Sequence, residues 1–252
     1  LEGKMTGVHV IYVNYGELDD LVGSLSSLDW SLNPRVHVHH NGPEPLSEKE
    51  IAWIHGNFAG KIMLYQSSTN LGFGCAVNRV VAEIDGRSDD VLVVANPDTT
   101  FHKGALRELV GAALTGPEGI YSPQIVTGGL RRFRFWFNGG SLSTWSLRTT
   151  MRMRGRPVHV KPGFTLEPCG FLPGAMMVMT FAVFSRLGGF DKNFFLYWED
   201  ADFCFRARAI GLRLCVVTGA RVWHAVGGSG SRRALSYFYY IQYSRGVFAR
   251  LI

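Results

Sequence analysis

Residues 188–224 read GGFDKNFFLYWEDADFCFRARAIGLRLCVVTGARVWH, and the rest of the chain is organised around this stretch. Its middle holds three carboxylates, Glu199, Asp200 and Asp202, directly after an aromatic run. Apolar residues then recur at helical spacing as far as Gly211, which is well placed to end a helix. Carboxylates beside aromatics at the start of a helix lie where burial raises a pKa and geometry can fix a general base. The stretch is therefore a candidate catalytic segment.

The same carboxylates also have a purely structural interpretation. Asp200 and Asp202 would favour the positive N-terminal end of the helix dipole, and Asp202 could pair with Arg206 one turn later. Because structural ion pairs also cluster charge, the stretch alone leaves both interpretations open. The choice between them depends on residues earlier in the chain.

The composition indicates a globular chain with an anionic partner. At 252 residues the chain can bury a substantial core, and 46% hydrophobic against 18% charged residues excludes a disordered tail. The 26 Lys and Arg exceed the 20 Asp and Glu, and several of them crowd into residues 131–156 and 232–250. Such clusters favour a sugar diphosphate, a lipid diphosphate or an acidic membrane surface. No zinc-finger spacing or base-reading motif accompanies them, so nucleic acid is not an expected partner.

The cysteines and the apolar runs indicate the compartment. Cys75, Cys169, Cys204 and Cys215 form no C-x-x-C pair, which argues against a metal knuckle or a redox motif. Two of them fall inside apolar patterns, as expected for buried free thiols in a reducing compartment. No signal peptide is visible, and no apolar run approaches the roughly 20 residues of a membrane span. We expect a cytoplasmic protein.

Strand and helix patterns alternate through the first 115 residues. The expected strands are 8–13, 36–40, 62–65 and 91–95, and helical spacing follows each of them at 18–28, 51–58, 76–84 and 106–113. Four such units predict a parallel sheet that is covered on both faces and wound right-handedly. Ligands of such sheets bind at the carboxyl ends of the strands. Asn14-Tyr15, His40-Asn41 and Asn96-Pro97-Asp98 all fall there.

Asn96-Pro97-Asp98 ends the most hydrophobic strand. The proline stops the ladder, and a carboxylate at this place contributes little to stability. A hard oxygen ligand at a strand's carboxyl end suits a Mg²⁺ or Mn²⁺ ion that also carries phosphate oxygens. The alternative is a simple Asx turn, because all these residues favour turns.

Residues 69–74, TNLGFG, precede the third expected helix. Backbone N–H groups at a helix start can bind a phosphate or a base. The alternative is a plain N-cap, with Thr69 or Asn70 as the capping residue. The segment is neither a P-loop nor the dinucleotide fingerprint, since its glycine spacing differs from both.

His224 follows a β-rich segment and precedes a glycine loop at 227–230. A histidine in such a place can ligate a metal or hold a diphosphate, although a single histidine is more often only hydrogen-bonded. No serine lies in a G-x-S-x-G elbow, so a hydrolase triad has no support.

These pieces, in this order, resemble the inverting family 2 glycosyltransferases of the GT-A fold. Within that family the chain is most similar to the bacterial rhamnosyltransferase and galactofuranosyltransferase-like branch. Four stretches that span nearly the whole chain carry the resemblance: VIYVNY at 10–15, NLGF at 70–73 with Asn78-Arg79, NPD at 96–98, and residues 189–224. The last is the most specific, because its GFD, FFxY, EDxD and CxRxxxxG pieces stand in family order and spacing.

The resemblance implies one α/β domain over residues 1–252, with a Rossmann-like, mostly parallel sheet flanked by helices. Residues 5–125 would form the nucleotide-binding half and residues 126–230 the acceptor and catalytic half. Residues 231–252 would form a C-terminal helical segment of a truncated chain. Residues 133–156, rich in glycine, arginine and aromatics, would form hairpins or a loop inserted over the site.

The resemblance also implies roles for single residues. Asp200, beside Glu199, would be the general base that deprotonates the acceptor hydroxyl. Asp98 would be the carboxylate of the D-x-D-type metal motif, and His224 the late histidine that completes a Mg²⁺ or Mn²⁺ site. The donor side would be formed by Tyr15, His40, Asn41, Asn70, Gly72, Asn78, Arg79, Asn96 and Asp98, and the acceptor side by Gly174, Ala175, Trp198 and Asp202.

One residue departs from the family pattern. The family usually has Asp-Asn after the second strand, where the aspartate reads the base, and this chain has His40-Asn41. A histidine offers different donors and acceptors from a carboxylate, so the nucleotide preference stays open.

The residue types agree with the implied chemistry. Sugar transfer from a nucleoside diphosphate needs charge stabilised on the leaving diphosphate, which a divalent ion supplies. It also needs a base on the opposite face of the sugar, worth about 10²–10⁴-fold in rate. We expect a metal-dependent inverting glycosyltransferase of bacterial surface polysaccharide synthesis. It would move L-rhamnose from dTDP-rhamnose to a hydroxyl of a glycan or lipid-linked glycan.

Two alternatives stay open. One is a transferase of UDP-sugars, either galactofuranose or a hexose. The other is a nucleotide-sugar-binding or scaffold protein without catalysis, for which His40 and the basic, aromatic C-terminus are the motivation. Donor binding without turnover would favour the second alternative.

The C-terminal segment also suggests a membrane contact. Arg232, Arg233, Arg245 and Arg250 interleave with aromatic residues between 237 and 248, as in an interfacial helix. This pattern predicts a position at the inner face of the plasma membrane. The alternative is a helix packed on the domain or on the partner of a homodimer.

Overall fold

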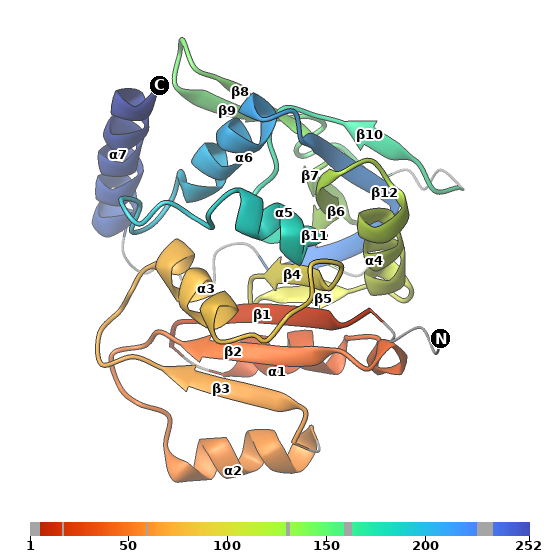
Figure 1. Ribbon diagram of the computed structural model, residues 1–252, viewed down its shortest axis with the longest axis vertical. Coiled ribbons are helices and arrows are strands. Elements are labelled where there is room, and N and C mark those ends of the chain that lie inside the picture. The colour runs from red at the N-terminus through yellow and green to blue at the C-terminus, as the bar shows by residue number, and fades with distance from the viewer. Residues whose placement is uncertain (1–5, 17, 59, 130–131, 159–162, 226–233) are drawn as a thin grey trace.

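The computed structural model describes residues 6–16, 18–58, 60–129, 132–158, 163–225 and 234–252 (Figure 1). Its centre is a ten-stranded mixed sheet. The first four long strands are parallel in the order β4-β1-β2-β3. Strands β1, β2 and β3 form one edge of the sheet, with β3 outermost. Their bounds are β1 (Val8–Asn14), β2 (Arg35–His40), β3 (Ile62–Gln66) and β4 (Val91–Ala95).

The second half of the chain extends this sheet without a break. β11 (Met176–Thr180) lies antiparallel between β4 and β6 (Gly119–Thr127), and β12 (Arg213–His224) pairs parallel with β6. Three short strands complete the sheet: β5 (Thr99–Phe101) and β10 (Leu166–Pro168) pair with β12, and β7 (Arg134–Phe137) pairs with β6.

Helices cover both faces, as the sequence predicts for buried strands. Apolar side chains of α3 (Phe73–Ala82), α5 (Phe181–Arg186) and α6 (Glu199–Ala209) form one core with the sheet. Side chains of α1 (Asp19–Ser26), α2 (Glu48–Asn57) and α4 (Ala105–Thr115) form the other. A 3-10 turn, η1 (Trp30–Leu32), follows α1.

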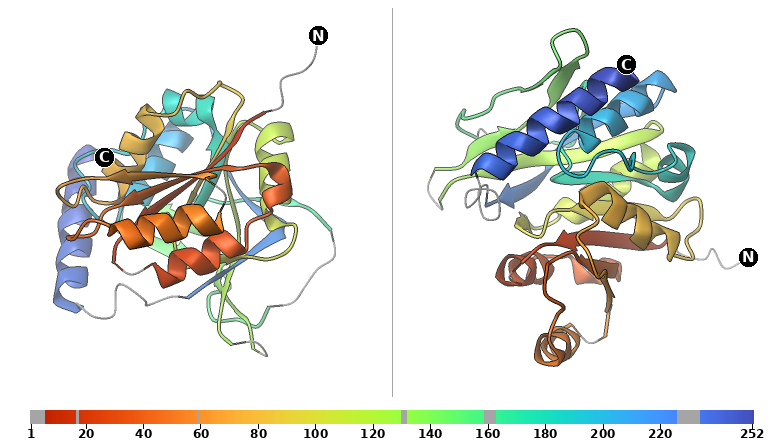
Figure 2. Two further views of the ribbon diagram at one scale, coloured as in Figure 1. Left: turned by 90° about the horizontal axis from the view of Figure 1, so that it is seen from below. Right: turned by 90° about the vertical axis from the view of Figure 1, so that its left-hand side faces the viewer.

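Two elements lie outside this layered core. The hairpin of β8 (Gly140–Ser143) and β9 (Arg148–Met151) forms its own two-stranded sheet, in the region predicted as hairpins or a loop. Helix α7 (Ala234–Leu251) packs beside α6 on the outside of the domain (Figures 1 and 2). Within the described residues, none of the helices combines the length and apolar character needed to cross a membrane.

The alternative interpretation of residues 69–74, an N-cap at Thr69 or Asn70, does not describe the start of the third helix. The helix begins at Phe73, and its N-cap is Gly72, which has φ 77° and makes no side-chain capping bond. A Cβ at this position would lie 2.2 Å from the carbonyl oxygen of Phe195, so only glycine fits. The side chain of Asn70 instead accepts a hydrogen bond from the Gly72 N–H at 2.8 Å. Close packing against a distant loop therefore decides where the helix begins.

A buried chain of polar side chains crosses strands β1, β2 and β3. His9 Nδ1 lies 3.0 Å from His37 Nε2, and His37 Nδ1 lies 3.0 Å from the hydroxyl of Tyr65. At the other end, His9 Nε2 lies 3.6 Å from Asp90 Oδ2. Burial lowers the pKa of both histidines, and that of His37 falls to about 3. The folded protein therefore holds both imidazoles neutral.

This burial predicts a loss of stability in mild acid. The pKa of His37 is lowered to about 3 and that of His39 to about 4, chiefly by burial. Below pH ~6.5 the unfolded chain binds protons that the folded protein excludes, so each histidine costs about 1.4 kcal/mol of stability per pH unit. Urea midpoints measured from pH 7 to pH ~5 should fall accordingly, and His37→Leu should flatten the slope. His55→Leu, on the exposed surface of α2, is the control. Equal slopes in wild type and both variants would contradict the expectation.

Candidate functional site

Asp98 and His224 meet where β4 ends. Asp98 stands between β4 and β5, and antiparallel pairing of β5 with β12 sets Thr99 opposite His224. The carbonyl of Asp98 accepts a hydrogen bond from the N–H of Ala225 at 3.1 Å, which continues this pairing. His224 Nε2 lies 3.1 Å from Asp98 Oδ1. Two residues 126 positions apart thus form one pair.

The surroundings of His224 suit a metal ligand. The residue is 6% exposed, and the ring of Trp136 packs edge-on against it with centroids 4.8 Å apart. Its Nδ1 is buried without a hydrogen-bond partner. Among the described residues, no group of three or more His, Cys, Asp or Glu is arranged to hold a metal. A carboxylate and an imidazole fit an ion of the Mg²⁺ or Mn²⁺ kind that takes its other ligands from phosphate oxygens and water.

Asp200 lies in the first turn of α6, with its carboxylate fixed by backbone donors. The N–H of Gly174 donates to Oδ2 at 2.9 Å, and the N–H of Ala201 donates to Oδ1 at 2.8 Å. Burial raises the pKa of Asp200, and these two hydrogen bonds oppose the rise. Since the residue remains partly accessible, the carboxylate is oriented but not sealed. This is the environment that a general base requires.

Glu199 differs from its neighbour. It is 6% exposed, and its Oε2 has no hydrogen-bond partner. Burial, followed by the charge of Asp200, raises the pKa of Glu199 to about 8. Burial and the neighbouring charge thus favour the protonated form of Glu199, whereas the backbone donors favour the charged form of Asp200.

One two-residue segment joins the two chemical centres. Gly174 donates its N–H to Asp200, and the carbonyl of Ala175 accepts the N–H of Asn96 at 2.9 Å. Thr99 then donates its hydroxyl to the carbonyl of Asn96 at 2.6 Å, across the turn that carries Asp98. The loop before β11 therefore fixes the carboxylate of α6 relative to the carboxyl end of β4.

The aromatic segment before α6 has a strained backbone and is held in place by contacts with α7. Tyr197 and Trp198 have φ values of 64° and 67°, in the left-handed region that such bulky residues rarely adopt. Helix α7 packs on this segment: Ser244 donates its hydroxyl to the carbonyl of Leu196 at 2.8 Å, and Phe248 packs on Trp198 with ring centroids 5.3 Å apart. The strained turn sets the direction in which α6 begins.

On the predicted donor side, Asn41 organises the 70–72 turn. Its Nδ2 donates to Asn70 Oδ1 at 2.7 Å, and its Oδ1 accepts the N–H of Leu71 at 2.9 Å. The N–H of Asn41 itself donates to the carbonyl of Asn14 at 2.7 Å, which ties the turn to the end of β1. Tyr15, 44% exposed, follows that strand end. The structure thus brings Tyr15, Asn41, Asn70 and Gly72 to one edge of the sheet.

His40 is buried beside them, 5% exposed. Its Nε2–H donates to the carbonyl of Glu44 at 2.9 Å, while Nδ1 has no hydrogen-bond partner. A Cβ on Gly42 would lie 2.7 Å from Nε2, so the glycine leaves room for the ring. His40 therefore braces the loop after β2.

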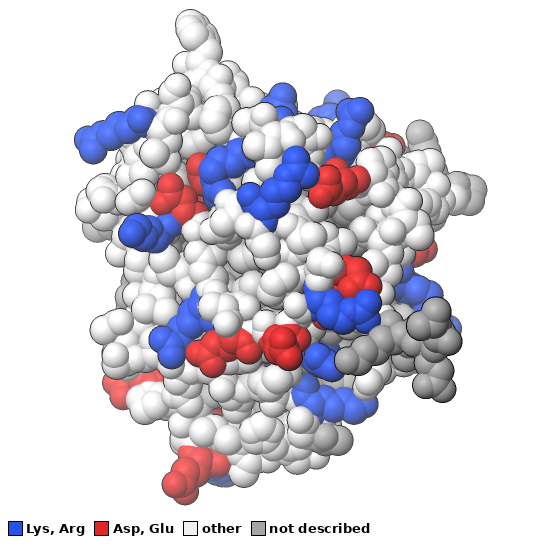
Figure 3. Space-filling model, in the orientation of Figure 1, with Lys and Arg blue, Asp and Glu red and all other residues white. Residues whose placement is uncertain are grey.

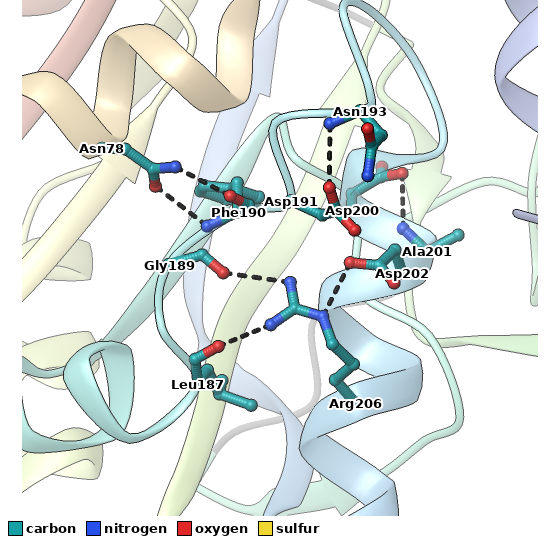
Figure 4. A network of polar contacts seen from close by, with 10 residues as sticks. All are labelled: Asn78, Leu187, Gly189, Phe190, Asp191, Asn193, Asp200, Ala201, Asp202 and Arg206. Atoms are coloured by element: carbon teal, nitrogen blue, oxygen red, sulfur yellow. Dashed lines mark hydrogen bonds and ion pairs between the residues drawn. The ribbon is translucent and has the colours of Figure 1, made fainter. Parts of the chain in front are cut away.

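Asn78 and Arg79 make contacts on α3 that the sequence did not predict. Both ends of the Asn78 amide bind the backbone of Phe190, with Nδ2 donating at 2.7 Å and Oδ1 accepting at 2.9 Å (Figure 4). Arg79 lies 3.9 Å from Glu83 in an exposed pair. Asn78 thus fastens the segment that leads into α6, and its donor role stays a prediction.

Asp202 forms the predicted ion pair with Arg206 (Figure 4). Arg206 Nε donates to the buried carboxylate at 2.8 Å, and its other nitrogens donate to the carbonyls of Leu187 and Gly189 at 2.6 and 3.0 Å. The structural interpretation thus accounts for this aspartate. Its predicted place on the acceptor side stays a prediction.

Two residues contact the candidate catalytic and metal-binding side chains in ways that sequence analysis did not predict. Gly174 was expected only on the acceptor side, yet its N–H orients Asp200. Trp136, in the arginine-rich segment, packs on His224. A backbone donor leaves no sequence signal, and an aromatic among many aromatics gives only a weak one.

Comparison with known proteins gives a consistent family. The family model described as "Glycosyltransferase like family 2" matches residues 46–249. The chain is 39% identical over 232 residues to "Rhamnosyltransferase WbbL" of Escherichia coli (strain K12), covering 86% of this chain and 83% of that protein. It is 29% identical over 194 residues to "N-acetylglucosaminyl-diphospho-decaprenol L-rhamnosyltransferase" of Mycobacterium tuberculosis (strain ATCC 25618 / H37Rv), covering 70% of this chain. The match spans 62% of the mycobacterial protein, less than two thirds of its length.

Solved structures with the same fold share little sequence. The crystal structure of GalNAc-T7 with UDP, GalNAc and Mn²⁺ aligns over 89% of this chain and 44% of that chain, at a TM-score of 0.71 and 13% identity. The mannosyltransferase PcManGT from Pyrobaculum calidifontis in complex with GDP-Man and Mn²⁺ aligns over 88% of this chain and 58% of that chain, at a TM-score of 0.59 and 15% identity. The shared architecture is the GT-A fold, as the sequence predicted.

Proposed function

This chain belongs to glycosyltransferase family 2, and from this premise we propose a metal-dependent inverting transferase for a nucleoside-diphosphate sugar. One observation supports the proposal above the others: the Gly174-Ala175 segment binds both Asp200 and the turn that carries Asp98. A base and a metal-side carboxylate thus belong to one rigid unit, as a single displacement requires.

In the proposed reaction Asp200 accepts the proton of the acceptor hydroxyl as that oxygen attacks the anomeric carbon. The bond from this carbon to the leaving diphosphate breaks on the opposite side, which inverts the configuration. Asp98 and His224 would hold a Mg²⁺ or Mn²⁺ ion, whose charge stabilises the leaving diphosphate when it is bound. The approach of His224 Nε2 to the hard carboxylate of Asp98, 3.1 Å from Oδ1, supports this assignment.

The proposed donor is dTDP-L-rhamnose. Two relatives carry rhamnosyltransferase names, and the one at 39% identity is aligned over 83% of its length. The proposed acceptor is a hydroxyl of a glycan or lipid-linked glycan, and the proposed place of action is the inner face of the plasma membrane. UDP-sugars remain a second proposed donor class. The reason is that His40 places an imidazole where the family usually has the carboxylate that reads the base.

Calorimetric titration should identify the donor. We expect the chain to bind dTDP-rhamnose in the presence of Mn²⁺ and to bind it at least tenfold more weakly without the metal. UDP-galactofuranose and UDP-glucose, titrated under the same conditions, serve as the comparison. If a UDP-sugar binds tightly and dTDP-rhamnose does not, the proposed donor would change and the proposed mechanism would stand. If the chain binds a donor with the same affinity in the presence and absence of Mn²⁺, the result would contradict metal dependence.

A further inference from the structure

The charge of the chain is divided unequally between its two halves. Residues 1–118 carry 8 Lys and Arg against 15 Asp and Glu, whereas residues 119–252 carry 18 against 5. All five acidic residues of the second half fall within 167–202. The segments 119–166 and 203–252 therefore contain no carboxylate side chain and eight basic residues each. Such an imbalance within one chain points to an anionic surface as a partner of the second half.

The first of these segments contains the β8–β9 hairpin. Trp145, in its connecting loop, is 95% exposed, the most exposed large apolar side chain among the described residues. Arg148 begins β9 and is exposed, and Arg152, also exposed, follows the strand. In Figure 3 the tip of the hairpin projects from the top of the molecule and shows no charged side chain on this face. An indole held in water at the tip of an arginine-bearing hairpin has no structural function within the domain.

The second segment contains α7, which has two different faces. Tyr240, Ser244 and Phe248, four residues apart, face the domain and contact the segment before α6. The other face presents Phe238, Tyr239 and Tyr243, which are 65, 60 and 52% exposed. Arg250 and the final residues, Leu251 and Ile252, are also exposed. Arg232 and Arg233, predicted to belong to this surface, lie outside the described residues.

These two elements lie at one end of the molecule. The hairpin tip is beside the C-terminal end of α7 in Figure 1 and in the right-hand view of Figure 2, and α2 lies at the opposite end in both. We propose that the outer face of α7 and the β8–β9 hairpin together bind the surface of a membrane that contains anionic lipids.

The chemistry of the two elements favours a bilayer over another protein. Tyrosine and tryptophan prefer the headgroup region, where the ring is apolar and the polar atom stays hydrated, and arginine binds lipid phosphate. A second copy of the chain would bring two halves of the same positive charge together. The docking would be peripheral, through side chains on one face of a helix and one hairpin tip.

The position of α7 gives the docking a consequence that rests on the proposed function. The inner face of α7 contacts Leu196 and Trp198, which come directly before Glu199 and Asp200. The lipid surface would thus lie about one helix diameter, ~10 Å, from the aromatic segment that precedes the base. A lipid-linked acceptor would reach the site without leaving the bilayer.

Vesicle cosedimentation tests the proposal without donor, acceptor or metal, so its outcome is independent of transfer activity. The chain should bind vesicles that contain phosphatidylglycerol at ~0.05 M salt and should not bind vesicles of phosphatidylcholine alone. Raising the salt to ~0.5 M should release most of the protein, because the Debye length then falls to about 4 Å. Failure to bind phosphatidylglycerol vesicles at low salt would overturn the proposal.

Substitutions define the surface. Arg148→Glu with Arg250→Glu should weaken vesicle binding by about 25-fold or more, since each basic residue near such a surface contributes about fivefold. The triple variant Phe238→Ser, Tyr239→Ser and Tyr243→Ser should weaken vesicle binding by about tenfold. Trp53→Ser, on exposed α2 at the opposite end, is the matched control and should change nothing. Equal losses in control and triple variant would overturn the assignment of the surface.

Fluorescence gives a readout that does not depend on the folding of a destabilised variant. Lipids brominated near the headgroup should quench the emission of the wild-type protein, and Trp145→Phe should remove most of the quenched fraction. Quenching that is unchanged in Trp145→Phe would show that the hairpin tip does not contact the bilayer. A dimer in solution that protects Tyr239 and Tyr243, with no vesicle binding, would replace the membrane with a second copy.

Discussion

Asp200→Asn is expected to lower the rate of sugar transfer by about 10²–10⁴-fold and to leave donor affinity within about twofold. The amide oxygen of asparagine can still accept the N–H of Gly174, so the fold of the loop should persist. The amide cannot take a proton from the acceptor hydroxyl, so the loss should appear in kcat. Initial rates with the donor identified by calorimetry, together with its Kd, measure both quantities.

Two further variants make this result specific. Asp89→Asn removes a carboxylate from an exposed pair with Arg87, and both rate and affinity should stay at wild-type values. Glu199→Gln imitates the protonated form that burial favours, so it should cost far less rate than Asp200→Asn. A Glu199→Gln enzyme as slow as Asp200→Asn would move the base from Asp200 to its neighbour. An Asp200→Asn enzyme with full activity would end the assignment altogether.

Asp98→Ala is expected to abolish the metal-dependent part of donor binding, a loss of about 10²–10³-fold in affinity. The variant leaves His224 as the remaining protein ligand that we assign, and one imidazole binds Mg²⁺ or Mn²⁺ poorly. Titration of the protein with Mn²⁺ alone should show the same loss, which separates metal binding from turnover. His224→Gln should weaken Mn²⁺ binding in the same direction.

The control for the metal site is the same change at a surface position, Asp89→Ala, which should bind Mn²⁺ and donor like the wild type. Thermal unfolding should show that Asp98→Ala remains folded, because the hydrogen bonds that hold its turn use the carbonyl of residue 98 and the carbonyl of Asn96, and neither involves the aspartate side chain. Retained Mn²⁺ dependence in Asp98→Ala would place the metal elsewhere in the chain.

The first half of the fold was predictable because its signals are local. β1 and β4 are short, mostly apolar runs, and β2 alternates valine with histidine before the turn signal at 41–43. Each of these strands is followed by apolar residues at helical spacing. Parallel strands joined by helices have essentially one handedness, so their arrangement follows from the pattern. The helix after Asp200 and its end near Gly211 were likewise visible, because both signals lie within one segment.

The second half was less predictable because its sheet is built from pairings between distant segments. β12 joins β6, β5 and β10, and no periodicity within any one of them specifies its partner. For the same reason the sequence did not identify Gly72 as the residue at which the third helix starts. The close approach of the Phe195 carbonyl, more than 120 residues away, makes glycine necessary there and displaces the expected cap.

The candidate site divides in the same way. Residue types and their positions at strand and helix ends are enough to single out Asp98, His224 and Asp200 as the side chains proposed for the chemistry. Their partners depend on folding: strand pairing brings His224 to Asp98, the N–H of Gly174 orients Asp200, and Arg206 pairs with Asp202. A side chain's identity is local information, but its partner depends on backbone groups brought close by folding, and those groups are the same in every residue.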